Sequence, residues 1–594
     1  MDKERFKIIK AIFSSLNIIR LVIINCIFFA ILILMMAGIA SASNGSKNKN
    51  QVLRQLNEDT VLLVQPSGLI IENDVPQRAT RQFLSYADNF TPLPKIIQSI
   101  KKAANDRRIT ALIFDFSKIG SMSLSSAYEI KAAIDEFTAS GKKYYAFSTQ
   151  YNLASYLLAA PSQRLCIDPF GDIDFSGLAA QGTFFGGMEE KTGIKYRVSK
   201  AGTYKGAADA YTEKAFTKEV RENYTALLSK CWDYFTTSCS KDLKIPEGVI
   251  SSYAESPLKA LTEANGDNTK ALLNLQLVSD VMDYDSFLNA LNISPDQLLN
   301  FKRFYESFDT ARSKNIISVI NLDGAITSST AYSYNENAND AVLIAKFEKA
   351  CRDPHVRGII LRINSGGGEV FASEKIRRAV EKARTEYQIP VVVSMGSVAA
   401  SGAYWIASSA DYIFANPFTM TGSIGVLAAF PSVGGALEKY LGISSDMVYA
   451  GAKPLSVLQE PGPEEMEILQ LEISHIYDTF LQTVSTGRNM DKTKVAEIAS
   501  GKVYSGEQAL DIGLVDKIGS FQDAITYTAE LCKLGNDYEV KTVMDEKTFL
   551  DELLSFAYDV RVNISELPFL QSLLDITTLS SANKFLLYTP LRVF

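Results

Sequence analysis

Histidine is nearly absent from this sequence. The chain has two histidines in 594 residues, His355 and His475, which lie 120 residues apart. A His-rich metal site cannot be built from them, and we expect no metal and no cofactor. A Ser-His-Asp triad would have to use one of the two, so hydrolytic chemistry would need a different base.

Cysteine is also sparse, and the six cysteines show neither metal-binding spacing nor a dense disulfide framework. Cys231 and Cys239 fall in one predicted helix, where a separation of eight residues spans about 12 Å. The Cα atoms of a disulfide lie about 5.5 Å apart. We therefore expect free, buried thiols.

The chain lacks an excess of positive charge. It has 60 Lys and Arg against 67 Asp and Glu, a net charge of −7, and 47% hydrophobic residues. This composition excludes a disordered chain and a polytopic membrane protein, and it argues against nucleic acid as a partner. The length suggests about three or four domains, or two large halves with additions.

One uncharged stretch runs from Leu21 to Ser46, and its first part is almost wholly apolar. A helix that spans a bilayer takes about 20 apolar residues. The stretch is preceded by the basic residues Lys3, Arg5, Lys7, Lys10 and Arg20. They predict that the N-terminus lies in the cytoplasm and the rest of the chain on the other side of the membrane. Ala40-Ser41-Ala42 leaves a cleaved secretory signal open. We expect an uncleaved anchor, because the stretch exceeds the roughly 7 to 15 apolar residues of a signal.

An internal repeat divides the chain, since residues 111–170 match residues 359–418 at a constant offset of 248. Each copy alternates strand, helix and strand, which predicts an α/β fold of βαβ units around a mainly parallel sheet, used twice. The predicted elements are strand 111–116, helix 126–137 and strand 143–149, and then strand 359–363, helix 372–387 and strand 391–395.

The two copies differ at residues suited to chemistry. The second has Asn364-Ser365-Gly366-Gly367-Gly368 after a strand, where the first has Phe116-Ser117-Lys118-Ile119-Gly120, and Ser401 stands opposite Leu153. Glycines after a strand leave backbone N–H groups open to a ligand, as in an oxyanion hole. A tight turn or a phosphate loop is the alternative, but no Walker lysine follows.

Ser401 lies among small residues just before an apolar run that predicts a helix start. A serine there can be a simple N-cap, but beside a glycine loop the nucleophile interpretation is favoured, with the N–H of Gly402 facing a developing oxyanion. We expect its small neighbours Ala399, Ala400 and Ala403 to line the site, which agrees with apolar substrate side chains.

A nucleophilic serine needs a base, and with histidine nearly absent a lysine or a carboxylate must serve. A lysine amine is useful only when neutral, and burial lowers its pKa. Lys205 lies in the uncharged run 201–207 and fits such burial; its counterpart in the second copy is Lys453. Ser423 is a candidate to hold the amine by a hydrogen bond.

Five motifs in this order resemble the signal peptide peptidase A family in its long, duplicated bacterial form. They are GTYK at 202–205, the glycine loop at 365–368, AASGAYW at 399–405, ANPFTMTGSIG at 415–425 and GKVYSGEQALDIGLVDKIG at 501–519. The family loop usually reads Ser-Pro-Gly-Gly-Ser, whereas this chain has Gly366 and Glu369 in place of the proline and the last serine.

The resemblance implies a membrane-anchored serine-lysine protease of the Clp and crotonase-like fold, which degrades cleaved signal peptides and other hydrophobic peptides. It implies Ser401 as nucleophile, Lys205 as general base, Ser423 as the residue that orients the lysine, and oxyanion donors at Gly402 and at Gly367 or Gly368. It also implies a single-pass protein of the bacterial inner membrane with its catalytic part outside the cytoplasm, and a homo-oligomer, expected to be a tetramer.

We divide the chain into an anchor (1–46), a protease-like repeat with a helical linker that supplies the lysine (47–310), a repeat that supplies the serine (311–540) and an apolar tail (541–594). Packing against the body or lying in the membrane interface are both open for the tail. Two other functions compete: a crotonase-type acyl-CoA enzyme, and an inactive, membrane-bound scaffold that only binds peptides.

Overall fold

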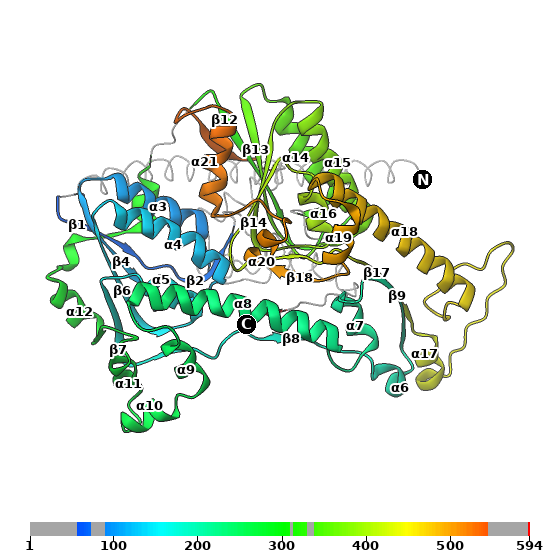
Figure 1. Ribbon diagram of the computed structural model, residues 1–594, viewed down its shortest axis with the longest axis horizontal. Helices are drawn as coiled ribbons and strands as arrows, with labels where there is room; N and C mark the ends of the chain where they lie inside the picture. The colour runs from blue at the N-terminus through cyan, green and yellow to red at the C-terminus, as the bar shows by residue number, and fades with distance from the viewer. Residues whose placement is uncertain are drawn as a thin grey trace, which may run out of the picture. The chain divides into compact units, whose positions relative to one another are not determined.

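The computed structural model (Figure 1) describes residue 56 and residues 58–72, 90–308, 313–328, 338–544 and 592–593. All but 306–308 belong to one compact unit, Leu56–Tyr305 with Asp309–Met544 and Thr589–Phe594. The predicted membrane helix, and the apolar tail from residue 545 up to its last few residues, lie outside the described residues. Within the described part, no helix is long and apolar enough to cross a bilayer.

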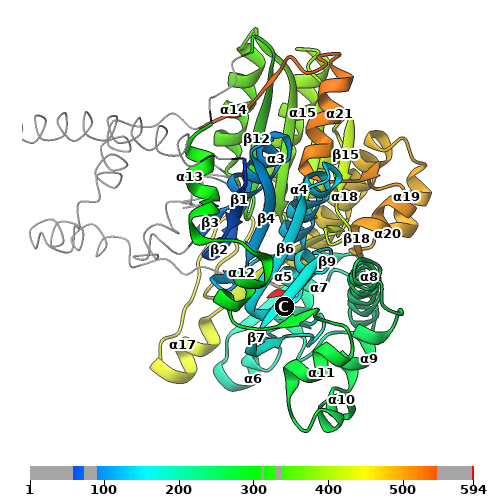
Figure 2. The same cartoon turned by 90° about the vertical axis from the view of Figure 1, so that its left-hand side faces the viewer.

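The first half of the chain contains a parallel sheet in the order β10-β7-β6-β4-β1-β11. Its strands lie side by side in Figure 2, with α12 on one face and α3 and α4 on the other. The elements predicted at 111–116, 126–137 and 143–149 are confirmed as β4, α4 and β6. The bounds are β1 Thr60–Val64, β4 Ile109–Asp115, β6 Lys143–Tyr151, β7 Arg164–Ile173, β10 Asp280–Val281, β11 Leu298–Asn300, α3 Leu93–Asn105, α4 Leu124–Ala139 and α12 Tyr284–Leu291.

The second half repeats this plan in a sheet of order β18-β16-β14-β13-β12-β20, in which β15 also pairs with β14 and β19 pairs with β15. All strand pairs are parallel except β16 with β18. The predictions at 359–363, 372–387 and 391–395 are confirmed as β13, α15 and β14. The bounds are β12 Ile316–Asp323, β13 Val356–Ser365, β14 Val391–Ala400, β15 Tyr412–Ala415, β16 Met420–Gly422, β18 Val503–Ser505, β19 Lys517–Ile518, β20 Glu539–Thr542, α14 Asp340–Arg352, α15 Val370–Thr385 and α21 Phe521–Leu531.

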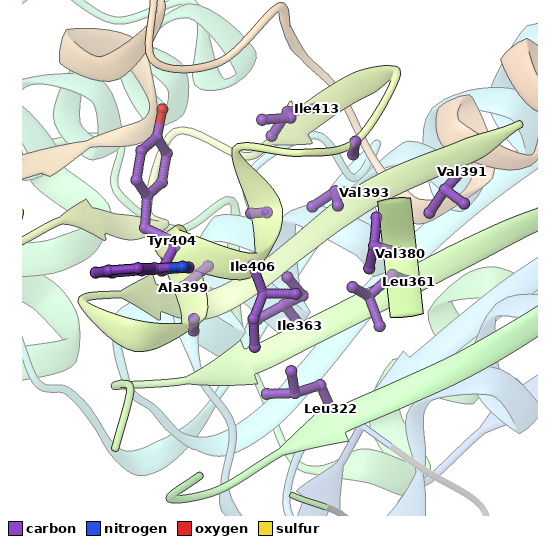
Figure 3. Close-up of a cluster of buried hydrophobic side chains, with 14 of the residues drawn as sticks. Leu322, Leu361, Ile363, Val380, Val391, Val393, Ala399, Tyr404, Ile406 and Ile413 are labelled. Carbon is purple, nitrogen blue, oxygen red and sulfur yellow. The ribbon is translucent and has the colours of Figure 1, made fainter. Parts of the chain in front are cut away.

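The core of the second half lies between this sheet and its helices. Leu322, Leu361 and Val393 from three neighbouring strands meet Val380 of α15 and Ile406 of α16 (Gly402–Ala407) (Figure 3). All five side chains are fully buried. Each contributes about 1.5 to 3 kcal/mol of transfer free energy, which makes this sheet a rigid support for the loops at its end.

One tyrosine in each half shows how closely the two copies correspond. Tyr404 in α16 donates a hydrogen bond of 2.7 Å to the carbonyl of Leu514. Its counterpart Tyr156 in α5 (Leu153–Ala159) donates one of 2.7 Å to the carbonyl of Leu277. The repeat found in the sequence is therefore a repeat of packing as well.

Strand β9 (Lys195–Ala201) and helix α8 (Lys218–Leu243) of the first half both contact the second half. Strand β9 pairs antiparallel with β17 (Val426–Ser432) of the second half. Helix α8 contacts α5 of the first half and β18 of the second. Cys231 and Cys239 both lie in α8 and are free thiols, as predicted. Shorter helices follow it: α9 Val249–Glu255, α10 Leu258–Glu263, α11 Asn268–Asn274 and α13 Phe301–Glu306.

Candidate active site

Ser401 occupies the turn between β14, which ends at Ala400, and α16, which begins at Gly402. Its φ of 56° is positive, a conformation that costs a non-glycine residue about 1 to 3 kcal/mol. Its backbone N–H donates to the Gly422 carbonyl at 2.9 Å, and every residue of α16 is buried. The surroundings therefore hold the strained turn in place.

The hydroxyl of Ser401 does not cap the helix that it precedes. The sequence left an N-cap serine open, but the Ser401 side chain accepts no hydrogen bond from the first turn of α16. The small neighbours Ala399, Ala400 and Ala403 are all buried, and Ala399 and Ala403 belong to the core. The expectation that they line the site was wrong, because all three alanines are buried.

Lys205 reaches Ser401 from the first half of the chain. It follows β9 and precedes α7 (Gly206–Thr212), and the pairing of β9 with β17 brings it to the second half. The Nζ atom of Lys205 lies 2.7 Å from Oγ of Ser401, 2.9 Å from the carbonyl oxygen of Ser423 and 3.0 Å from Oγ of Ser423. The structure thus brings together all three residues singled out in the sequence.

The surroundings of Lys205 favour a neutral amine. Only 5% of the residue is exposed, and burial lowers the pKa of its amine to about 7. A neutral amine has two N–H donors and one lone pair. The two donors match the carbonyl and hydroxyl oxygens of Ser423, which leaves the lone pair for the Ser401 hydroxyl.

Ser423 lies directly after β16 and presents two oxygens to the amine. Its φ of 51° is also positive, and its N–H donates to the Lys502 carbonyl at 2.7 Å. This backbone bond fixes the turn from which the carbonyl and the hydroxyl both face Lys205.

The glycine loop follows β13, and its N–H groups are not equivalent. The N–H of Gly367 donates to Oγ of Ser365 at 3.2 Å. Among the described residues, the N–H groups of Gly368 and Gly402 have no hydrogen-bond acceptor. A Cβ built on Gly402 would lie 3.3 Å from the Gly368 nitrogen, so the two free donors are neighbours beside Ser401.

Gly367 is a spacer in this loop. Its φ is +99°, and a Cβ there would lie 2.7 Å from the Gly402 nitrogen and 2.9 Å from Cβ of Ser401. Any side chain would press on both groups. The next carboxylate, Glu369, is exposed and accepts a hydrogen bond of 3.2 Å from the N–H of Ser328.

The counterpart of Ser401 in the other copy has no hydroxyl. Leu153 begins α5 at the position of Ser401. Lys453, the counterpart of Lys205, lies in the loop between α17 (Gly434–Leu441) and α18 (Pro463–Gly487). Sequence reasoning missed the bond from Gly367 to Ser365 and the contacts of residues 500–502 with Lys205. The motif at 501–519 overlaps residues 500–502, but the residue types in it did not indicate a function for this segment.

Comparisons with known proteins show the family to which the chain belongs. The model of "Peptidase family S49" matches the chain twice, at residues 136–290 and 383–535. The chain belongs to peptidase family S49. It is 31% identical over 557 residues to Protease 4 of Haemophilus influenzae, with 90% of this chain and 88% of the relative covered.

Two further relatives support the assignment to family S49. Protease 4 of Salmonella typhi is 30% identical over 584 residues, covering 96% of this chain and 92% of the relative. The chloroplastic serine protease SPPA of Arabidopsis thaliana is 26% identical over 513 residues, covering 82% and 73%. The chain is therefore a serine peptidase of the long signal peptide peptidase A form.

Proposed function

We propose that this serine peptidase works through a Ser401–Lys205 dyad, with Ser423 orienting the lysine. The observation that carries the proposal is the distance of 2.7 Å between Nζ of a buried Lys205 and Oγ of Ser401. A base is most effective when its pKa lies near the working pH, and the pKa of this amine is lowered to about 7.

The reaction begins when neutral Lys205 takes the hydroxyl proton of Ser401 and Oγ attacks the carbonyl carbon of a peptide bond. The N–H groups of Gly368 and Gly402 donate to the oxyanion that forms. The ammonium of Lys205 then gives its proton to the departing amine. Lys205, neutral again, activates the water that hydrolyses the acyl-enzyme.

The substrate class comes from the relatives and from the N-terminal sequence. A further relative, from Enterococcus faecium, is described as a putative signal peptide peptidase SppA and is 34% identical over 224 residues. Cleaved signal peptides and other hydrophobic peptides are the substrates that we propose for this chain. We also assign the paired βαβ halves to the Clp and crotonase-like fold, whose use of two backbone N–H donors fits this site.

The proposed location is the bacterial inner membrane. The basic N-terminal end and the apolar stretch within residues 1–46 support a single anchor whose following chain lies outside the cytoplasm. Signal peptides left in the membrane after cleavage would then meet the enzyme on the side where its site lies.

A second copy of this chain is the partner that we propose. Phe418 in the second half is 9% exposed and packs edge-to-face on Tyr234 of α8, with ring centroids 5.2 Å apart. Its counterpart in the first half, Phe170, is 99% exposed. Helix α18, which follows the second copy as α8 follows the first, exposes Ile468 and Leu471. These unmatched faces support head-to-tail assembly, with a tetramer expected from the family.

The test is turnover of a hydrophobic peptide together with labelling by a serine-directed phosphonate, located by mass spectrometry. The adduct should fall on Ser401. Lys205→Ala should lose both peptide turnover and phosphonate labelling, whereas Lys453→Ala, the matched control, should keep both. An acyl-CoA enzyme would give no adduct on Ser401. A scaffold would give neither adduct nor turnover, and loss of turnover in Lys453→Ala alone would refute the choice of base.

A further inference from the structure

Three backbone segments meet around Lys205, and the proposal made here rests on the dyad proposed above. One segment is the end of β9 with Lys205, from the first half. The second is the turn around Ser423, and the third is the loop 500–502, both from the second half. The third segment touches the other two and carries no side chain that reaches the reacting atoms.

The loop 500–502 is bonded to the segment that carries Lys205. The N–H of Tyr204 donates to the Ser500 carbonyl at 2.8 Å, and the N–H of Thr203 donates to Oγ of Ser500 at 3.0 Å. Ser500 is itself fixed, because its N–H donates to the hydroxyl of Tyr477 in α18 at 3.0 Å. The two residues just before Lys205 are therefore both hydrogen-bonded to Ser500.

The same loop is bonded to the segment that carries Ser423. The N–H of Ser423 donates to the Lys502 carbonyl at 2.7 Å, and the N–H of Gly501 donates to the Ile424 carbonyl at 2.8 Å. A single stretch of three residues thus holds both the amine's own segment and the segment that supplies two of its hydrogen-bond partners.

Gly501 allows this contact because it has no side chain. Its φ is +84°, and a Cβ there would lie 2.6 Å from the nitrogen, 2.8 Å from Cα and 3.0 Å from Cβ of Lys205. Two other glycines make the packing equally close. A Cβ on Gly202 would lie 2.8 Å from the Ser500 carbonyl carbon, and one on Gly425 would lie 3.1 Å from Cα of Gly501.

We propose that the loop Ser500–Lys502 is a positioning element for the general base, and that Gly501 and Ser500 set the placement of Lys205 against Ser401. One half supplies the base and the other supplies the nucleophile. Contacts between the halves must therefore fix the position of Lys205 relative to Ser401. Backbone-to-backbone contact does this with little freedom, because neither main chain can rotate out of the way as a side chain can. A displacement of about 1 Å at such a site costs on the order of 100-fold in rate.

The experiment compares two glycine variants of the full-length protein with nearly the same φ, +84° at Gly501 and +85° at Gly141. Gly501→Ala places a methyl group against Lys205. Gly141→Ala, the control, has a φ of +85° and nothing within 4 Å of the new Cβ, so it carries the φ strain without the contact. The readouts are the rate of phosphonate labelling on Ser401, its dependence on pH, and Tm.

The expected result is labelling about 100-fold slower in Gly501→Ala than in Gly141→Ala. The midpoint of its pH profile should also move upward from about 7, because a displaced amine is better hydrated and its pKa returns toward that of a free lysine. Equal rates and equal midpoints in the two variants would overturn the positioning role. Absence of labelling in the wild type would instead refute the dyad itself.

A second variant covers the case in which Gly501→Ala does not fold. Ser500→Ala removes only the oxygen that accepts from Thr203 and adds no atom. It should slow labelling by roughly three- to tenfold, the effect of losing one hydrogen bond, and raise the pH midpoint while Tm changes little. A lower Tm with an unchanged midpoint would show a merely structural contact and contradict the proposal.

Discussion

Lys205 and Ser401 are 196 residues apart in the sequence, yet Nζ of the first lies 2.7 Å from Oγ of the second. The pairing of β9 with β17 makes this contact, so the site exists only where the two halves of the chain meet. In the proposed mechanism each half alone is inert, since one holds a base without a nucleophile and the other the reverse.

Replacing Lys205 by methionine should stabilise the folded protein at neutral and acidic pH. Burial lowers the pKa of the amine from 10.5 to about 7, so between these pH values the unfolded chain binds more protons than the folded one. The cost of the buried amine is therefore full below pH 7 and vanishes above about 10.5. One pKa unit corresponds to about 1.4 kcal/mol, so at pH 6 the free energy of unfolding of the variant should exceed that of the wild type by up to roughly 5 kcal/mol.

Urea unfolding of wild type and Lys205→Met at pH 6 and at pH 10 measures this gain. The free energy of unfolding should differ clearly at the lower pH and little at the higher one. The same difference at both pH values would mean that the lysine keeps an ordinary pKa in the folded protein.

The two middle glycines of the loop should respond differently to alanine. Gly367→Ala places a Cβ 2.7 Å from the Gly402 nitrogen at a φ of +99°, so it should reduce kcat by about 100- to 1,000-fold, as does the loss of an oxyanion donor. Gly366→Ala has nothing within 4 Å and should keep most of its activity. Steady-state kinetics of both variants on one peptide decides, and equal loss in both would contradict the geometry of the hole.

Ser423→Ala removes one of the two oxygens that accept from the amine but keeps the Ser423 carbonyl. Since one such bond is worth about 1 kcal/mol, kcat should fall by roughly three- to tenfold with little change in KM. Complete loss of activity would give Ser423 a larger part than orientation.

Phe170→Asp should weaken assembly without touching the site within one chain. Phe170 is 99% exposed, whereas its counterpart Phe418 is covered by α8, so a charge at the first position should exclude an apolar partner face. Sedimentation of the full-length protein in detergent measures the change. A wild type that is already monomeric, or a variant that assembles normally, would refute the contact.

The sequence predicted local structure well because local structure depends on neighbours in the chain. Apolar periodicity located β4, β13 and β14, and small residues before an apolar run located the turn at Ser401. The difference between the copies pointed to Ser401 and the glycine loop, whereas Lys205 and Ser423 came from their local sequence and from a resemblance to a known family. Their roles remain proposals that the experiments above address.

Other features could not be predicted because they depend on packing between distant segments. Gly367 and Gly368 cannot be distinguished in the sequence. In the described part of the structure the N–H of Gly367 is hydrogen-bonded to Ser365, whereas the N–H of Gly368 is free to donate to a substrate. The loop at Ser500 acts through its main chain, which any residue possesses. Ala399, Ala400 and Ala403 were wrongly expected to line the site, because a run of small residues does not reveal which of them are buried.

The most direct measurement of the central claim is the rate of phosphonate labelling at Ser401 of the wild-type protein as a function of pH. A buried amine with a pKa lowered to about 7 must lose its proton to act, so the rate should rise tenfold per pH unit below 7 and level off above about 8. A rate that keeps rising to pH 10, as for a hydrated lysine, would contradict the account.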